Sequence, residues 1–327
     1  MQTHFSRLIA ASLVLLTAGM SSALAQESFN VRYSWRLKGE YAPFYVAQEQ
    51  KLFEKAGLKV TLGEGAGAPA ALAGLLQGRE DAVVLPAIFA LTAISKGMPI
   101  KLIALYQPVI PIAVVSFPDN PVKTPKDMEG KRLPFSTGDT FGSYLSVFCR
   151  INSIDCSKIN QVMVDANVRA SLFMSKKVEA IATYVNVDVP VLQAESKVPL
   201  TIMEVGNFGL KIPGLAVVSS TALLESKPDK LKAFLAAVDK AMDMARANPD
   251  AAAKDLMASW PAAPAGPLVT EQVKQSLASY PVIDGHPSGW IEPKALSETL
   301  ALMKQVGEID AIKPLDEYYT NSLFAKK

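Results

Sequence analysis

Hydrophobic and polar positions divide this chain into short apolar runs, rich in β-branched residues, that alternate with longer stretches at helical spacing. This alternation is typical of parallel α/β units, in which each strand returns to the sheet through a helix. The first such series predicts strands at 29–34, 58–62, 80–85 and 100–106, with helices between them at 43–56, 69–77 and 87–96. Gly57 and Gly97 follow two of these helices, a position where glycine commonly ends a helix. The series predicts one lobe.

A turn-rich segment, FPDNPVKTPKDMEG, separates this lobe from a second series. Here the pattern predicts strands at 131–136, 159–164 and 179–184, helices at 140–152, 171–177 and 189–197, and return strands at 200–204 and 216–219. The remaining pattern is helical, at 227–248, 249–259, 270–280 and 293–306. Because these last helices have no strands of their own to cover, we expect them to pack on the first lobe. The predicted organisation is therefore lobe 1 at 26–117, lobe 2 at 118–214, and the C-terminal helical part of lobe 1 at 215–327.

The first 25 residues have the pattern of an export signal. Arg7 precedes the apolar run LIAASLVLLTAGM, and Ala23-Leu24-Ala25 is a small-residue cleavage pattern. No cysteine follows the run to carry a lipid anchor. We therefore expect cleavage near Ala25 and a periplasmic protein of about 300 residues, which exceeds the size that one core usually holds.

Charge and composition narrow the functional classes. The chain has 33 Lys+Arg against 31 Asp+Glu, and 50% of its residues are hydrophobic. A near-neutral chain with scattered charge gives no support for nucleic-acid binding, and this apolar content excludes a disordered chain. We expect a monomer.

Two cysteines, Cys149 and Cys156, are seven positions apart. Export permits a disulfide between them, and two free, buried thiols are equally compatible with the sequence. They do not indicate a metal site, because the only histidine after residue 25, His286, is distant in the chain. We expect neither a metal nor a cofactor.

Candidate ligand-binding residues gather where predicted strands lead into helices, which is where open α/β sheets bind ligands. GEGAGAP (63–69) offers backbone N–H groups at a helix start, but it lacks the Gly-Lys-Ser/Thr of a phosphate loop. A tight turn, helix caps and helix packing explain many of the same residues. The residues that we select as ligand-binding are Trp35, Glu40, Tyr41, Gly65, Gly67, Ser136, Thr137, Gly138, Phe141, Tyr184, Asn186, Asp188 and Phe208.

Catalytic constellations are weak by comparison. A serine hydrolase needs a histidine oriented by a carboxylate, whereas His286 lies in a turn-rich segment and no Gly-x-Ser-x-Gly elbow occurs. No pair of carboxylates stands out for acid–base work. We expect a protein that is not an enzyme.

The segment after Trp35, YAPFYVAQEQKLFEKAGLKV, and an ordered set of later motifs resemble a known superfamily. These motifs are GEGAG, LLQGREDAVV, ISKGMPIKLIA, TPKDMEGKRL, STGDTFGSYL, KKVEAIATY, PGLAVVSS and KPDKLKAFLAAVDKAM. Together they resemble the substrate-binding proteins of ABC importers that bind nitrate, sulfonates, taurine or the pyrimidine precursor of thiamine. The resemblance covers nearly all of the chain after the export signal.

The resemblance implies an α/β, two-lobed type II periplasmic binding protein fold whose lobes close on a small molecule. It implies delivery of that molecule to an ABC permease and its ATPase. The aromatic loops look closest to the pyrimidine-precursor branch, with rings stacking on Trp35 or Tyr41. That branch often has a histidine after the tryptophan, where this chain has RLKGEY. A sulfonate, nitrate, taurine or aromatic acid held by Arg36 or Lys38 therefore stays an alternative.

Two other classes share this superfamily pattern. A ligand-sensing subunit of a membrane signalling system would look the same in sequence. The fungal pyrimidine synthase resembles the fold too, but it uses a cysteine-rich motif and an active-site histidine that are missing here.

Overall fold

Five strands form the sheet of the first lobe. In the computed structural model, which describes residues 26–325, the strand order is β2-β1-β3-β10-β4. The strands are β1 (Glu27–Tyr33), β2 (Leu58–Gly63), β3 (Ala82–Pro86), β4 (Ile100–Leu105) and β10 (Leu215–Ser220). β1 is parallel to β2 and β3, whereas β10 runs antiparallel between β3 and β4. The predicted export signal lies outside the described residues.

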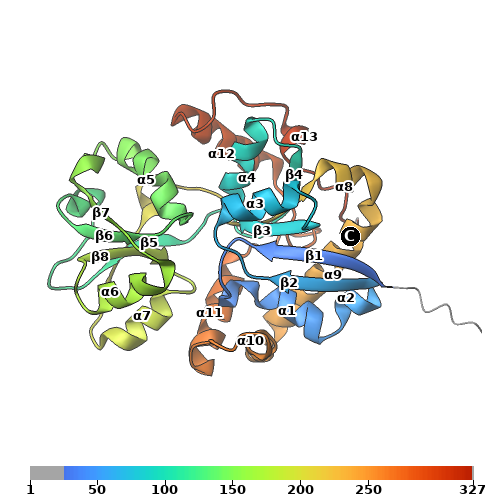
Figure 1. Ribbon diagram of the computed structural model, residues 1–327, viewed down its shortest axis with the longest axis horizontal. Helices are drawn as coiled ribbons and strands as arrows, with labels where there is room; N and C mark the ends of the chain where they lie inside the picture. Colours follow the sequence, from blue (N-terminus) through green and yellow to red (C-terminus); the bar gives the residue numbers. More distant parts are fainter. Residues whose placement is uncertain (1–25, 326–327) are drawn as a thin grey trace, which may run out of the picture.

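Helices from both ends of the chain cover this sheet (Figure 1). The N-terminal ones are α1 (Ala42–Glu49), α2 (Leu52–Lys55), α3 (Ala68–Leu76) and α4 (Ala87–Ser95). The C-terminal ones are α8 (Thr221–Ser226), α9 (Pro228–Ala247), α10 (Pro249–Ala258), α11 (Gly266–Ser279), α12 (Pro293–Gln305) and α13 (Leu315–Tyr318). Phe234 of α9 stacks on Phe29 of β1 with ring centroids 4.5 Å apart, and on Phe53 of α2 at 5.4 Å. Residues more than 200 positions apart in the chain thus close one core.

The single helix predicted at 43–56 is two helices. Lys51 has a φ of 57°, in the left-handed region, and this residue separates α1 from α2. Phe44, Tyr45 and Phe53 on these helices are buried in the first-lobe core. These three members of the aromatic cluster that follows Trp35 therefore serve packing.

The second lobe contains a five-strand layer with a gap in its ladder. β5 (Ile112–Ser116) runs antiparallel between β8 (Ala180–Tyr184) and β9 (Thr201–Glu204), and β6 (Arg132–Phe135) is parallel to β7 (Asn160–Met163). One backbone bond, from Glu179 N to Arg132 O at 3.2 Å, joins β8 to β6. The helices α5 (Thr140–Ile151), α6 (Arg169–Met174) and α7 (Val189–Ser196) cover it.

β5 corrects the predicted lobe boundary at residue 117. We assigned 26–117 to lobe 1, but the five residues of β5 pair only with β8 and β9 among the described strands. The prolines of FPDNPVKTP follow the first strand of the second lobe and do not precede it. Because β5 is buried on both faces, its apolar run is compatible with either sheet and does not reveal which one it joins.

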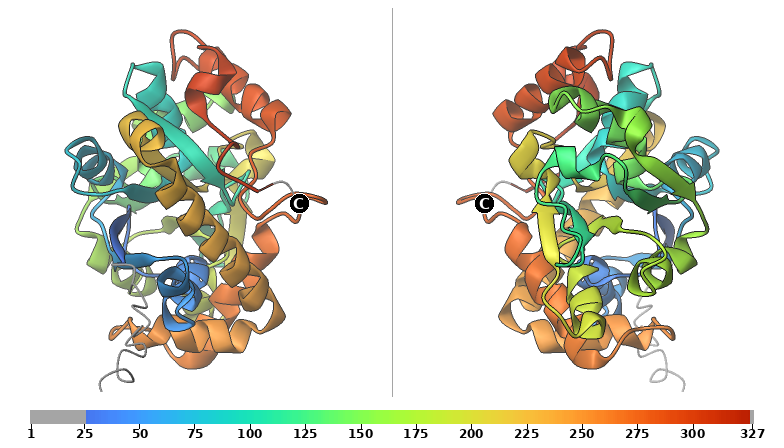
Figure 2. Two further views of the ribbon diagram at one scale, coloured as in Figure 1. Left: turned by 90° about the vertical axis from the view of Figure 1, so that its right-hand side faces the viewer. Right: turned by 90° about the vertical axis from the view of Figure 1, so that its left-hand side faces the viewer.

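The chain passes between the lobes twice, and the two crossing segments are bonded to each other. Ile110 N donates to Ile212 O and Gly214 N donates to Gln107 O, both at 2.8 Å. Two α/β lobes joined by a two-segment crossing make up the type II periplasmic binding protein fold that the sequence predicts. Figure 2 shows the lobes from two further sides.

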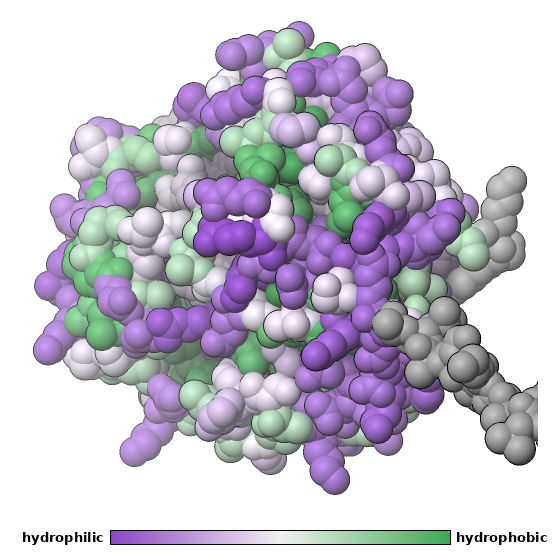
Figure 3. Space-filling model, turned by 45° about the vertical axis from the view of Figure 1, so that its right-hand side comes forward, coloured by the Kyte–Doolittle hydropathy of each residue, from purple (hydrophilic) through white to green (hydrophobic). Residues whose placement is uncertain are grey.

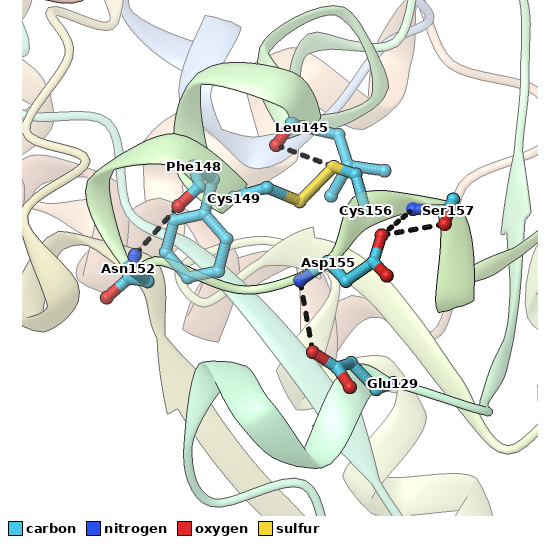
Figure 4. Close-up of a disulfide and its surroundings, with 8 residues drawn as sticks. All are labelled: Glu129, Leu145, Phe148, Cys149, Asn152, Asp155, Cys156 and Ser157. Carbon is cyan, nitrogen blue, oxygen red and sulfur yellow. Dashed lines mark hydrogen bonds between the residues drawn. A yellow bond between two sulfur atoms is a disulfide. The ribbon is translucent and has the colours of Figure 1, made fainter.

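A disulfide joins Cys149 at the end of α5 to Cys156 in the following 3-10 turn (Figure 4). Asp155 accepts from the backbone N–H of Ser157 beside it, and Asn152 Nδ2 donates to Phe148 O. Of the two alternatives left open by the sequence, the bridge is the one present. It staples one end of α5 within the second lobe.

One face of the molecule shows how polar and apolar side chains are distributed on the surface. Figure 3 shows a face on which hydrophilic side chains predominate and hydrophobic ones form separate small groups. Within residues 26–325, no helix combines the length and the apolar character that a membrane crossing requires. The same residues contain no group of three or more His, Cys, Asp or Glu side chains placed to hold a metal ion.

Candidate functional site

A small cavity of about 60 Å³ lies between the lobes, where the carboxyl ends of strands from both sheets meet. We call it the inner cavity. The first lobe lines it with Trp35, Lys38, Glu40, Tyr41 and Phe89, among others, and the second lobe with Gly138, Asp139, Thr140, Phe141, Arg169, Thr183 and Tyr184. This is the position at which open α/β sheets hold ligands.

The first-lobe wall is the loop at 34–41, which we call the Trp35 loop. Buried contacts behind this loop hold it in place. Tyr41 stacks on Tyr33 of β1 with ring centroids 4.2 Å apart. Tyr280 donates its hydroxyl to Glu40 O at 2.9 Å, and Gly39 N donates to Gln272 Oε1 at 3.1 Å. Trp35, at the front of this loop, is half-buried and stacks on no ring within the described residues. Its indole is therefore presented to the space between the lobes.

The second-lobe wall is held by polar side chains. Asp139 caps α5, accepting from Gly142 N at 2.6 Å and from Ser136 N at 2.9 Å. The hydroxyl groups of Thr140 and Tyr184 lie 2.9 Å apart and link α5 to the end of β8. These bonds hold the Tyr184 ring in the cavity wall.

Arg169 is a cavity residue that the sequence analysis missed. Its Nε donates to Pro134 O at 3.1 Å and its Nη2 to Ala182 O at 2.6 Å, so the guanidinium bridges β6 and β8 where their ladder is open. Its Nη1 has no hydrogen-bond partner within the described residues, and no carboxylate pairs with the group there. The position of Arg169 at the start of α6, after a strand end, is the only signal that could have found it.

One ion pair joins the lobes at the edge of the cavity. Lys38 Nζ lies 2.8 Å and 2.9 Å from the two carboxylate oxygens of Asp188, and 4.9 Å from the centroid of the Tyr184 ring. Burial alone raises the pKa of Asp188, but the Lys38 charge and hydrogen bonds from Thr183 and Tyr184 N outweigh it and lower the pKa. The charge of Lys38 is therefore already paired with a carboxylate of the protein.

Glu40 is a buried carboxyl group without an ion-pair partner in the described chain. The residue is 7% exposed, and burial raises its pKa from an ordinary 4.5 to about 7, with the nearby Lys38 charge opposing this shift. At neutral pH the group is divided between its charged and neutral forms. It can accept a hydrogen bond from a ligand in one form and donate one in the other.

Six of the thirteen selected residues line the inner cavity: Trp35, Glu40, Tyr41, Gly138, Phe141 and Tyr184. Asp188 lines a larger groove of about 760 Å³, which we call the outer groove. Trp35, Lys38, Arg169 and Thr183 line both spaces, so the inner cavity and the outer groove adjoin at these residues. The ring of Tyr41 is 2% exposed, so the ring-stacking role expected of it is better met by Trp35.

The other six selected residues have different contacts. Ser136 Oγ donates to Val164 O at 3.0 Å, and Asn186 Nδ2 donates to Ser276 Oγ at 2.9 Å across the lobe boundary. Thr137 is exposed, and Phe208 packs on the core.

The two selected glycines of GEGAG, Gly65 and Gly67, do not line the inner cavity. A Cβ atom on Gly65 would lie 2.0 Å from Tyr33 O, and one on Gly67 would lie 3.4 Å from Gly138 Cα. Both serve the close approach of backbone segments, so we do not place them against a ligand.

Solved structures with the same fold are known. A protein of Bordetella bronchiseptica RB50 matches with a TM-score of 0.73 and 19% identity, over 91% of this chain and 96% of that one. The periplasmic aliphatic sulphonate binding protein SsuA of Escherichia coli matches with a TM-score of 0.68 and 15% identity, over 91% and 98%. The desulfurization enzyme DSZB matches with a TM-score of 0.60 and 14% identity, over 90% and 97%. The fold therefore occurs in binding proteins and in an enzyme.

No curated protein matches the chain. A family model does match, over residues 38–252, and this range includes Lys38, Glu40, Arg169 and Asp188. This match covers most of both lobes. The chain belongs to the NMT1/THI5-like family.

Proposed function

We propose that this protein is the periplasmic solute-binding component of an ABC import system and carries one small molecule between its lobes. It works as a monomer, hands the ligand to a permease and its ATPase, and catalyses no reaction. The observation that carries the proposal is the inner cavity, which two lobes share and which combines an unstacked indole with two polar groups, Glu40 and Arg169. A site divided between two lobes can bind by hinge closure.

The proposed ligand is a flat aromatic or heterocyclic molecule of pyrimidine-like size. Trp35 and Tyr184 offer ring surfaces, and each ring contact contributes about 1 kcal/mol beyond burial. Glu40 can bind a ring nitrogen or an amino group, and Arg169 Nη1 can bind a carbonyl oxygen. The apolar walls and few polar groups are typical of small-molecule sites.

A sulfonate or an aromatic acid is the second candidate. The observation that favours it is Arg169, whose guanidinium lies in the cavity wall without a carboxylate partner among the described residues. The same class of ligand is named for the SsuA protein of Escherichia coli, which shares the fold. Of the two cations that we expected to recognise an acid, Lys38 is paired with the Asp188 carboxylate, whereas Arg36 contacts only the neutral side chain of Asn167.

The test is a melting-temperature screen of the purified protein with pyrimidines, aromatic acids, sulfonates and nitrate. A ligand that binds only the folded state raises the melting temperature. At a ligand concentration of 100 times its Kd, the free energy of unfolding increases by about 2.7 kcal/mol. We expect one chemical class to raise it and the others to leave it unchanged. A panel without any shift, together with turnover of one of the compounds, would contradict the transport role.

A further inference from the structure

The outer groove carries positive charge that the protein leaves uncompensated. Arg36, from the Trp35 loop of the first lobe, and Arg169, from α6 of the second, both line it. Arg36 bonds the neutral side-chain oxygen of Asn167, and Arg169 bonds two backbone carbonyl oxygens. Neither guanidinium has a carboxylate within 4.0 Å in the described part of the chain, whereas Lys38 beside them does.

The remaining charges of the groove are already engaged. Asp188 accepts from Lys38, and Glu64 Oε1 accepts from Leu37 N at 2.6 Å. Counting all five side chains, three cations face two carboxylates, so the groove has a net positive charge. A guanidinium presents a planar set of N–H donors that matches carboxylate, sulfonate and phosphate oxygens.

The groove and the inner cavity adjoin each other, because they share part of their lining. Trp35 and Arg169 line both spaces, whereas Arg36 lines the outer groove alone. A molecule whose ring lies in the inner cavity against Trp35 and Arg169 would therefore reach Arg36 with a substituent that extends into the groove. The groove wall also includes apolar side chains, among them Leu37, Leu192 and Trp260. The proline-rich segment 261–267 supplies part of that wall.

We propose that the ligand is bipartite, with an aromatic ring in the inner cavity and, on a short linker, an anionic group in the outer groove between Arg36 and Arg169. This inference rests on the proposed function and adds a second subsite to it. The anionic group is a carboxylate, a sulfonate or a phosphate ester, since all three offer the same oxygens to a guanidinium. Because Arg36 and Arg169 belong to different lobes, the anion also favours the closed form.

The experiment compares charged and neutral forms of one scaffold. Titration calorimetry measures the affinities of 4-phenylbutanoate, 3-phenylpropane-1-sulfonate and 2-phenylethyl phosphate, with 4-phenylbutanamide as the neutral reference. We expect at least one anion to bind ten times more tightly than the amide or better, with this ratio falling as salt is raised because exposed charges are screened. The strongest of the three anions identifies the group.

Arg36→Gln and Asn167→Ala separate the anion subsite from lobe closure. Both remove the contact between Arg36 and Asn167, but only Arg36→Gln removes the charge. We expect Arg36→Gln to reduce the anion-to-amide ratio at least fivefold, and Asn167→Ala to preserve it. If Arg36→Gln weakens the anion and the amide equally, Arg36 acts through closure and the subsite is refuted. If the wild type binds the anions and the amide equally, the anion subsite is refuted as well, but the proposed function is not affected. If the wild type binds none of the four compounds and the melting screen gives no hit, the result counts against both the subsite and the proposed function.

Discussion

The two lobes present their halves of the site by different physical means. In the first lobe, the Trp35 loop rests on a large aromatic core, and its backbone is hydrogen-bonded to the side chains of Gln272 in α11 and Tyr280 just after it. In the second, the wall depends on side-chain bonds from Asp139, Arg169 and Asp188, and a disulfide staples the far end of α5. The first half is held mainly by aromatic packing with two buried hydrogen bonds, and the second mainly by side-chain hydrogen bonds.

This difference indicates which wall of the site can rearrange when a ligand binds. A close-packed wall has few alternative arrangements, because every shift opens voids or creates overlaps. Polar bonds can be exchanged for bonds to a ligand at little cost when the partners stay satisfied. We therefore expect the first lobe to supply a rigid ring surface, and the second lobe to supply groups that reorient when a ligand enters.

The largest expected effect tests the rigidity of the first lobe. In Gly65→Ala the new Cβ would lie 2.0 Å from Tyr33 O, which is backbone and cannot move aside. We expect the free energy of unfolding to fall by about 3 kcal/mol, since overpacking against backbone is severe. Denaturant titration measures the change.

Gly74→Ala is the matched control for this substitution. In that helical position the Cβ would lie 3.3 Å from Glu80 Cγ, which belongs to a flexible side chain. We expect unchanged or slightly higher stability, because alanine is the better helix former by about 1 kcal/mol. Equal losses in both variants would show that the Trp35 loop is not tightly packed.

The next largest effect is a pH dependence that originates in Glu40. Because its pKa rises from 4.5 to about 7 on folding, the folded state holds a proton that the unfolded state has lost between these pH values. The contribution of Glu40 to the free energy of unfolding is therefore fully present below pH 4.5 and is lost as the pH rises through 7. The total loss is about 3 kcal/mol. Relative to wild type, Glu40→Gln should gain stability between pH 4.5 and pH 8.

Denaturant titrations at pH 4.5, 6 and 8 follow this difference. Glu204→Gln, on an exposed position of β9, is the control and should track the wild type at each pH. A constant difference between Glu40→Gln and wild type across the three values would mean that the carboxyl is not buried in the folded protein in solution.

The disulfide tests whether the second lobe depends on its staple. Replacing both Cys149 and Cys156 by alanine removes a cross-link over a short loop, which we expect to lower the free energy of unfolding by about 2 kcal/mol. Hydrogen exchange should accelerate in α5 and leave β1 and β3 unchanged. Accelerated exchange throughout both sheets would show that the lobes do not unfold separately.

Periodicity predicted most elements because each strand or helix carries its own pattern. It could not assign β5, since an apolar run fits either sheet, nor the break at Lys51, whose left-handed backbone has no residue marker. Trp35, Glu40 and Tyr184 were accessible to sequence reasoning because crossover loops line such sites. Arg169 was not, because its role depends on a gap between two strands that only the fold creates.

The central claim is that Trp35 is a ligand surface and not a packing residue. The most direct test is titration calorimetry of Trp35→Ala with the compound that gives the largest melting shift in the wild type, together with denaturant titration of both proteins. The account predicts a loss of affinity of tenfold or more, with a change of less than about 1 kcal/mol in the free energy of unfolding. Wild-type affinity in Trp35→Ala would contradict it.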